Sequence, residues 1–64
     1  MYNNLKSIRK SKNISVQNLK KVLGLATNAA YYKKENGKVK FTLEEAKKIA
    51  DYIGLTIEEI FFNS

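Results

Sequence analysis

Apolar residues recur along this chain at intervals of three or four positions, which is the spacing of one face of an α-helix. The recurring groups predict five helices, at residues 3–12, 15–23, 27–36, 42–53 and 56–62. No long segment alternates between apolar and polar residues, so β-strands have little support. We therefore predict an all-α fold, with residues 1–64 forming one domain without a linker or a repeat.

Residues typical of helix starts and helix ends lie between these segments. Ser15 begins the second segment, directly before Val16, and Thr42 and Thr56 are each followed three residues later by a glutamate. This spacing is typical of a capping box, in which each side chain accepts a hydrogen bond from the other residue's backbone N–H. Three glycines follow helical stretches and predict left-handed helix ends: Gly24, Gly37 and Gly54.

The apolar faces are expected to meet in one small core, because a chain of this length buries only about 60% of the surface that its unfolded form exposes. The predicted core residues within helices are Leu5, Ile8, Val16, Leu19, Val22, Leu23, Ala30, Tyr31, Leu43, Ala46, Ile49, Ala50, Ile53, Ile57, Ile60 and Phe61. Ile14, Leu25 and Leu55 would join them from the connections.

The composition argues against an enzyme. There is no Cys, and hence no disulfide or thiolate metal site, and no His, the commonest general base and zinc ligand. The carboxylate pairs Glu44/Glu45 and Glu58/Glu59 fall in first helical turns, where capping explains them better than catalysis. We expect no cofactor, metal or small-molecule ligand. No apolar stretch approaches the ~20 residues of a membrane span, so we expect a cytoplasmic protein without membrane contact.

The net charge of +6 is unevenly distributed along the chain. Residues 1–40 carry ten Lys and Arg against Glu35 alone, a net charge of +9, and residues 41–64 carry −3. A basic region of this kind suits a polyanion, because neutralised phosphates release their condensed counterions. A lysine-rich solvated surface would give the same count, and charge alone does not separate the two interpretations.

The second and third predicted helices are joined by Gly24-Leu25-Ala26, a short turn that is typical of a helix-turn-helix motif. One face of the third helix predicts base contacts in the major groove, because asparagine can pair with adenine, lysine with guanine, and alanine or tyrosine with a thymine methyl. These base-contact candidates are Asn28, Ala29, Tyr32 and Lys33. Asn28 has an equally good alternative role as a helix cap, and an exposed Tyr32 or Lys33 is otherwise ordinary solvated surface.

Phosphate contacts are predicted at two edges of this surface. Gln17 and Asn18 lie in the first turn of the second helix, where backbone N–H groups and the helix dipole favour an anion. Asn36, Lys38 and Lys40 lie in the loop after the third helix, and we expect them to contact the DNA backbone rather than bases.

From Leu5 to Phe61 the sequence resembles the phage repressor and Cro family of helix-turn-helix domains. The matching segments are Ile14-Ser15…Leu19…Val22-Leu23-Gly24, then Glu35-Asn36-Gly37-Lys38, then Thr42-Leu43-Glu44-Glu45-Ala46…Ile49-Ala50…Ile53-Gly54-Leu55-Thr56-Ile57-Glu58-Glu59-Ile60-Phe61. The resemblance implies a compact, five-helix, lambda-repressor-like domain whose third helix enters the major groove of double-stranded DNA.

The chain departs from the family pattern at three places. Ten residues separate Gly24 from Glu35, one more than is usual, which implies an altered turn or helix start. Val16 stands where the family often has a phosphate-binding glutamine, and Lys34 stands where a buried apolar residue is common. The Lys34 side chain therefore either extends past the core to solvent or belongs to a rotated helix.

These features predict a sequence-specific regulator of transcription that binds a double-stranded DNA operator. Because no second domain follows in these 64 residues, we expect a Cro-like phage or prophage repressor. The alternatives are an antitoxin or a restriction-system controller of the same fold, or a protein-interaction module that does not bind DNA. Neighbouring Phe61 and Phe62 cannot both face one core, so we predict that Phe62 forms the interface of a weak homodimer. The alternative is that both fold over the first helix of a monomer.

Overall fold

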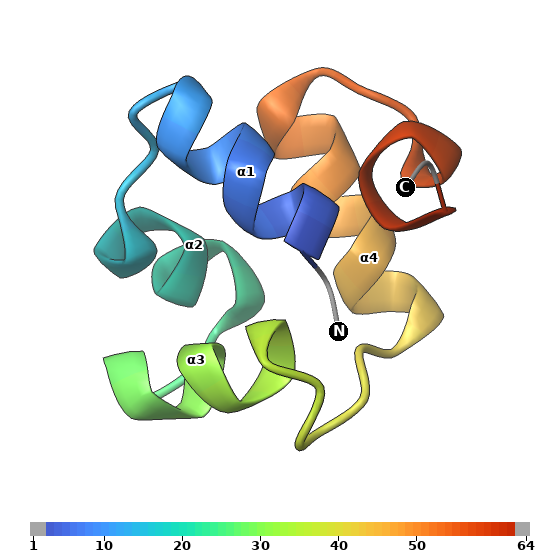
Figure 1. Cartoon of the computed structure of the whole chain (residues 1–64). Helices are drawn as coiled ribbons and strands as arrows, with labels where there is room; N and C mark the ends of the chain where they lie inside the picture. The colour runs from blue at the N-terminus through green and yellow to red at the C-terminus, as the bar shows by residue number, and fades with distance from the viewer. Residues whose placement is uncertain (1–2, 63–64) are drawn as a thin grey trace.

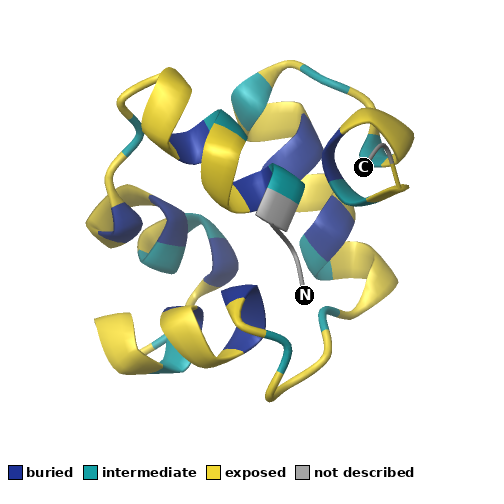
Figure 2. Ribbon diagram, in the orientation of Figure 1, coloured by how far each residue is buried: buried dark blue, intermediate teal, exposed yellow. Residues whose placement is uncertain are grey.

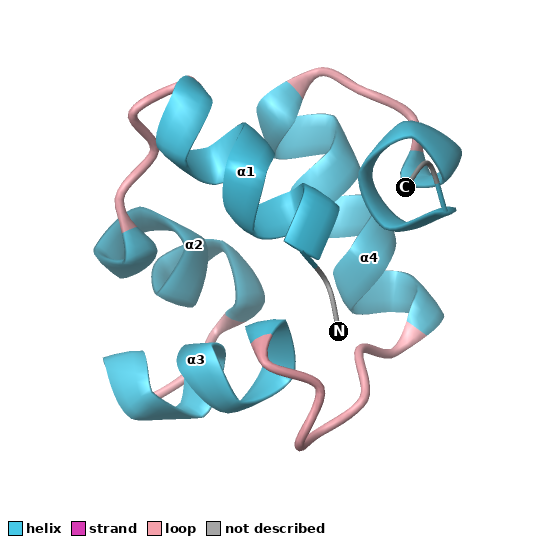
Figure 3. Ribbon diagram, viewed as in Figure 1, coloured by secondary structure: helices cyan, strands magenta, loops and turns pink. Residues whose placement is uncertain are grey.

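A computed structural model of the protein describes residues 3–62. Within that range the chain forms five helices and no strand (Figure 1, Figure 3). They are α1 (Asn3–Ser11), α2 (Val16–Leu23), α3 (Asn28–Glu35), α4 (Leu43–Ile53) and the short π-helix η1 (Glu58–Phe62). The predicted all-α, five-helix fold is confirmed, and every helix end lies within two residues of its predicted position.

The predicted capping groups define the helix ends. At the start of α4, Thr42 Oγ1 accepts a hydrogen bond from the Glu45 backbone N–H at 3.0 Å, and Glu45 Oε1 accepts one from the Thr42 N–H at 3.0 Å. Thr56 and Glu59 form the same reciprocal pair at the start of η1, at 2.9 and 3.1 Å. The predicted left-handed helix ends are also present, with φ values of 72°, 86° and 86° at Gly24, Gly37 and Gly54.

The two capping boxes also set the pKa values of their glutamates. Burial by itself raises the pKa of Glu45, but hydrogen bonds from the Thr42 backbone and from Lys34 outweigh it, so the net pKa lies below its ordinary value. The backbone N–H of Thr56 lowers the pKa of Glu59 in the same way. Both carboxylates are therefore stabilised in their charged form by folding.

All five helices contribute to one core. Each of them has one large side chain with no exposed surface: Leu5, Leu19, Tyr31, Ile49 and Ile60. These residues pack with the buried sides of the helices shown in dark blue in Figure 2. Burying an aliphatic or aromatic side chain of this size contributes about 1.5–3 kcal/mol, so the loss of any one would remove a large part of the stability of so small a domain.

The core differs from the prediction at the start of α4. Helical periodicity predicts that Leu43 faces inward, but it is 78% exposed. Phe41, which is not among the predicted core residues, packs against the core from the preceding loop. Thr42 caps α4, so Leu43 occupies the first helical position, and α4 buries its later residues Ala46, Ile49 and Ala50 instead. The connection before α4 therefore contributes a core contact, Phe41, that helical periodicity does not predict.

The last helix is a π-helix of five residues rather than the ordinary α-helix that the sequence predicts. A helix this short has few internal hydrogen bonds, so tertiary contacts decide its geometry. The buried Ile60 is the anchor of η1, and the Asn4 side-chain amide donates to the Glu59 and Ile60 carbonyls from α1. The end of the described chain is thereby attached to the first helix.

Candidate nucleic-acid interface

The α2–α3 unit is closed by a turn at residues 24–27. Gly24 adopts the left-handed conformation with open space around it, so its requirement is for the backbone angle and not for a close approach. The Leu25 N–H donates to the Lys20 carbonyl at 3.0 Å, while the Leu25 side chain packs against the core. Thr27 then starts α3 as its N-cap. This arrangement has the form of a helix-turn-helix motif, as the sequence predicts.

The outer face of α3 carries the predicted base-contact residues. Asn28, Ala29 and Lys33 are exposed, and Tyr32 is 43% exposed. No residue of this set is acidic. The opposite face is in the core, where Tyr31 is completely buried, as expected. The Tyr31 ring contacts the neighbouring Tyr32 ring edge-on, with centroids 6.2 Å apart. The structure therefore presents these four side chains together on one accessible surface.

The alternative role of Asn28 as a helix cap is wrong. Thr27 Oγ1 accepts the Ala30 N–H at 3.1 Å, so the cap is one residue earlier in the chain. Asn28 occupies the first helical position with an exposed side chain. Its amide is therefore available for an external partner.

The first turn of α2 presents the next pair of candidates. Gln17 and Asn18 are both exposed, whereas Val16 is buried in the core. Ser15 Oγ accepts the Asn18 backbone N–H at 3.1 Å, so Asn18 can offer a phosphate only its side chain. This favours Gln17 as the stronger of the two phosphate candidates.

The loop after α3 carries the three remaining phosphate candidates, Asn36, Lys38 and Lys40, all of them exposed. The loop folds back onto the helix, since the Lys33 carbonyl accepts the Lys38 N–H at 2.9 Å and the Val39 N–H at 3.2 Å. The backbone donors at these two positions are thus used within the protein. Any contact to DNA from Lys38 must come from its side-chain ammonium.

Lys34 is buried, so its side chain does not extend to solvent as one alternative predicts. The alternative of a rotated helix is also wrong, because Tyr31 faces inward as predicted. The Lys34 side chain is only 11% exposed, and its Nζ donates to Glu45 Oε1 at 3.0 Å and to the Lys40 carbonyl at 3.3 Å. The ammonium therefore has polar partners within the protein, at the end of the loop after α3 and in the first turn of α4.

A buried polar cluster that is not among the residues predicted from the sequence supports α3 from beneath. Arg9 of α1 donates to Glu35 through Nε at 2.9 Å and through Nη2 at 3.1 Å, and Tyr31 OH donates to Glu35 Oε2 at 2.9 Å. The hydrogen bond to Glu35 raises the pKa of Arg9, and burial, followed by the Glu35 charge, raises the pKa of Tyr31. Arg9 is therefore charged and Tyr31 a neutral donor at physiological pH.

Two features of the sequence indicate this cluster. Glu35 is the sole acidic residue in the basic part of the chain, and it lies four residues after Tyr31, a predicted core residue. Residues four apart share a helix face, so Glu35 is expected near the core, where a carboxylate requires a cationic partner.

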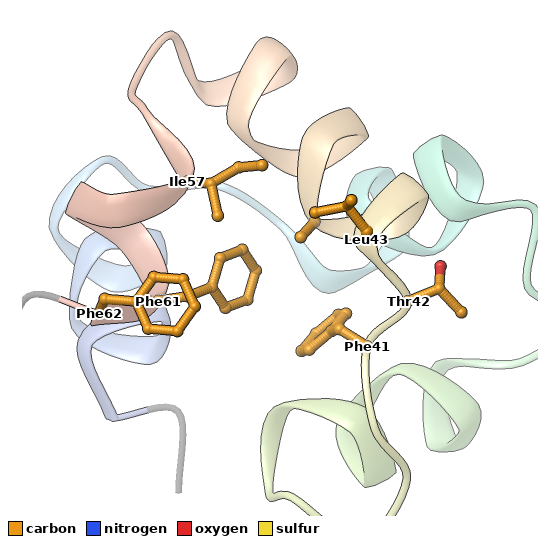
Figure 4. Close-up of a pocket in the computed structure, with 7 residues that line it drawn as sticks. Phe41, Thr42, Leu43, Ile57, Phe61 and Phe62 are labelled. Atoms are coloured by element: carbon orange, nitrogen blue, oxygen red, sulfur yellow. The ribbon is translucent and has the colours of Figure 1, made fainter.

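An apolar groove of about 260 Å³ lies on a different surface, between the segment before α4 and η1 (Figure 4). Phe41 and Leu43 line one side, and Ile57, Phe61 and Phe62 line the other. Phe61 is half-buried and meets the Phe41 ring edge-on, with centroids 5.2 Å apart. Phe62 is 76% exposed, so the alternative in which both phenylalanines pack within a monomer is wrong.

The part of the chain that the structure describes has neither a candidate membrane span nor a candidate metal site. None of its helices is long and apolar enough to span a bilayer. Among the same residues, no group of three or more acidic side chains is arranged to hold a metal ion.

The fold and the exposed α3 face define a helix-turn-helix DNA-binding domain. Residues 5–60 match the helix-turn-helix family of the Cro/C1 type, and the chain belongs to that family. Its members are DNA-binding regulators rather than enzymes. No curated protein and no solved structure matches the sequence.

Proposed function

We propose that the protein is a sequence-specific repressor of the Cro type, from a phage or prophage, that reads the major groove with α3. The observation that carries this proposal is the outer face of α3. Asn28, Ala29, Tyr32 and Lys33 lie together there, exposed, without an acidic neighbour among them, on a helix that is anchored from beneath by Tyr31. Their side chains include donors, acceptors and apolar groups of the kinds that distinguish base pairs in the major groove.

The charge distribution is consistent with DNA binding at the outer face of α3. The residues up to position 40 comprise α1, α2, α3 and the loop after α3, and they carry a net charge of +9. Arg9 and Lys34 among them are buried and paired with glutamates, so the exposed lysines provide the charge available to DNA. Gln17 and Asn18 on one edge and Asn36, Lys38 and Lys40 on the other are the proposed phosphate contacts. Contacts to phosphate fix the register of the protein on the duplex, and the four residues of α3 then specify the sequence.

A salt titration with duplex DNA tests this proposal. The association constant should fall steeply as salt rises, with a slope in log K of about 0.9 for each phosphate that the protein neutralises. Selection of bound duplexes from a random pool then identifies the operator. A slope near zero would refute DNA binding by the basic region, and a pool that yields no preferred sequence would refute specific recognition.

We also propose that the working unit is a weak homodimer on a two-fold operator, with Phe62 in the interface. Phe62 and Leu43, 76% and 78% exposed, flank the apolar groove, and a second copy would cover both of them. A patch of this size is small, so DNA would stabilise the dimer by holding both copies. The two α3 helices should then enter successive major grooves about 34 Å apart.

A further inference from the structure

Lys34 is the only buried lysine among the residues that the structure describes. Its side chain is 11% exposed, and its ammonium joins α3 to two other segments by donating both to the Lys40 carbonyl and to Glu45 in the first turn of α4. The ammonium also lies 5.9 Å from the centroid of the Phe41 ring. It is therefore surrounded by the end of the loop and the start of the next helix.

The loop at residues 36–40 is fixed at both of its ends. At the near end the Lys34 carbonyl accepts the Gly37 N–H at 3.1 Å, and the Lys33 carbonyl accepts the Lys38 N–H at 2.9 Å. At the far end the Lys34 ammonium donates a hydrogen bond to the Lys40 carbonyl at 3.3 Å. One residue of α3 thus contacts both ends of the loop that carries the proposed phosphate contacts.

We propose that Lys34 is a positioning residue for DNA binding, whose ammonium fixes the loop at residues 36–40 against α4 so that Lys38 and Lys40 meet the DNA backbone. This inference rests on the proposed phosphate contacts of that loop. Lys34 does not present its own charge to DNA, because it is buried and paired with Glu45 at 3.0 Å. Its contribution is to order the loop before binding, which removes an entropic cost from the complex.

The first test replaces Lys34 with Met, which has an unbranched side chain suited to the apolar surroundings but no ammonium. Lys48→Met is the matched control, because Lys48 also pairs with a glutamate of α4, Glu44, at 3.6 Å, but is half-exposed and remote from the loop in sequence. Affinity for a random duplex is measured by fluorescence anisotropy, with circular dichroism to verify the fold. Lys34→Met should weaken binding about threefold to tenfold more than Lys48→Met. Equal effects of the two substitutions would overturn the proposal.

A second pair of variants distinguishes positioning by Lys34 from electrostatic attraction, because the two predict opposite changes in affinity. This test does not require Lys34→Met to be folded. Glu45→Gln and Glu44→Gln each remove one negative charge and so raise the net charge by one. Electrostatic attraction alone therefore predicts that both bind DNA at least as tightly as the parent. Glu45→Gln also loosens the anchor of the Lys34 ammonium. Positioning by Lys34 therefore predicts that Glu45→Gln binds more weakly than Glu44→Gln. Equal or tighter binding by Glu45→Gln would overturn the proposal.

A third experiment separates this inference from the proposed function. In the double variant Lys38→Ala/Lys40→Ala, adding Lys34→Met should have little further effect, because Lys34 acts through those two residues. A full additional loss would mean that Lys34 acts independently of those two residues and would overturn positioning through the loop. Unchanged binding by the double variant would instead refute the phosphate role of the loop, and the inference with it, whatever Lys34→Met does.

Discussion

Substitution of Glu35 by Gln should destabilise the domain far more than substitution of an exposed glutamate. Glu35 has a side chain that is 1% exposed and accepts three hydrogen bonds, two from Arg9 and one from Tyr31. Glutamine retains one acceptor oxygen but turns an N–H₂ group toward these donors. The Arg9 guanidinium would then remain buried without a counter-charge, which costs about 3–5 kcal/mol.

This cost is comparable to the whole stability of the domain. A chain of this length is stable by about 3–10 kcal/mol, from ~0.05–0.15 kcal/mol per residue. With an unfolding entropy of about 2.1 cal/mol/K per residue, a loss of 3 kcal/mol lowers the melting temperature by roughly 20 °C. Urea and thermal unfolding followed by far-ultraviolet circular dichroism would measure both quantities. We expect Glu35→Gln to unfold near physiological temperature or to lack a folded baseline.

Two controls test whether the buried charge is the cause. Glu44→Gln breaks an exposed ion pair with Lys48 and should cost less than about 1 kcal/mol. The triple variant Arg9→Met/Tyr31→Phe/Glu35→Met removes the whole polar cluster, and apolar replacement of a buried pair is commonly neutral or stabilising. If Glu35→Gln unfolds like Glu44→Gln, or if the triple variant is as unstable as Glu35→Gln, the charge argument is wrong.

The caps, the α3 surface and the exposed phenylalanine each give a further prediction. Folding lowers the pKa of both capping-box glutamates, so the two carboxylates should stabilise the fold fully above the ordinary glutamate pKa of about 4.3. This contribution should be lost as the pH falls toward their pKa values in the folded protein. Urea midpoints that do not change between neutral and acidic pH would contradict this. Lys38→Ala should weaken binding to operator and random duplexes alike, whereas Lys33→Ala should cost about 1–3 kcal/mol at the operator and relax one base position; equal losses on both duplexes for both variants would reject the assignment. Phe62→Ala should lower affinity and cooperativity on a two-half-site duplex and leave the fold intact. Tyr52→Ala is the control, because Tyr52 is an exposed aromatic residue outside the groove. Sedimentation and binding titrations in which Phe62→Ala does not differ from the parent would exclude this dimer.

The order of the helices and their ends could be predicted from the sequence because they depend on local interactions. A hydroxyl followed by glutamate, or a glycine after a helical stretch, acts through backbone groups a few residues away, so Thr42 with Glu45 and Gly24 have the same effect in any helical fold. The burial of Tyr31 and the exposure of Lys33 follow from helical periodicity in the same way.

Only the tertiary structure decided which residues meet across the chain. Arg9 and Glu35 are 26 residues apart, and nothing in the local pattern states that this arginine, among the basic residues around it, is the one beneath α3. Phe41 packs against the core and meets Phe61 of η1, whereas Leu43 is exposed, and periodicity does not specify where η1 lies. The Lys34 ammonium is buried because the fold brings Glu45 and the Lys40 carbonyl within hydrogen-bond distance of it. Local rules are set by neighbours along the backbone, whereas these pairings are set by the distances that the folded core imposes between helices.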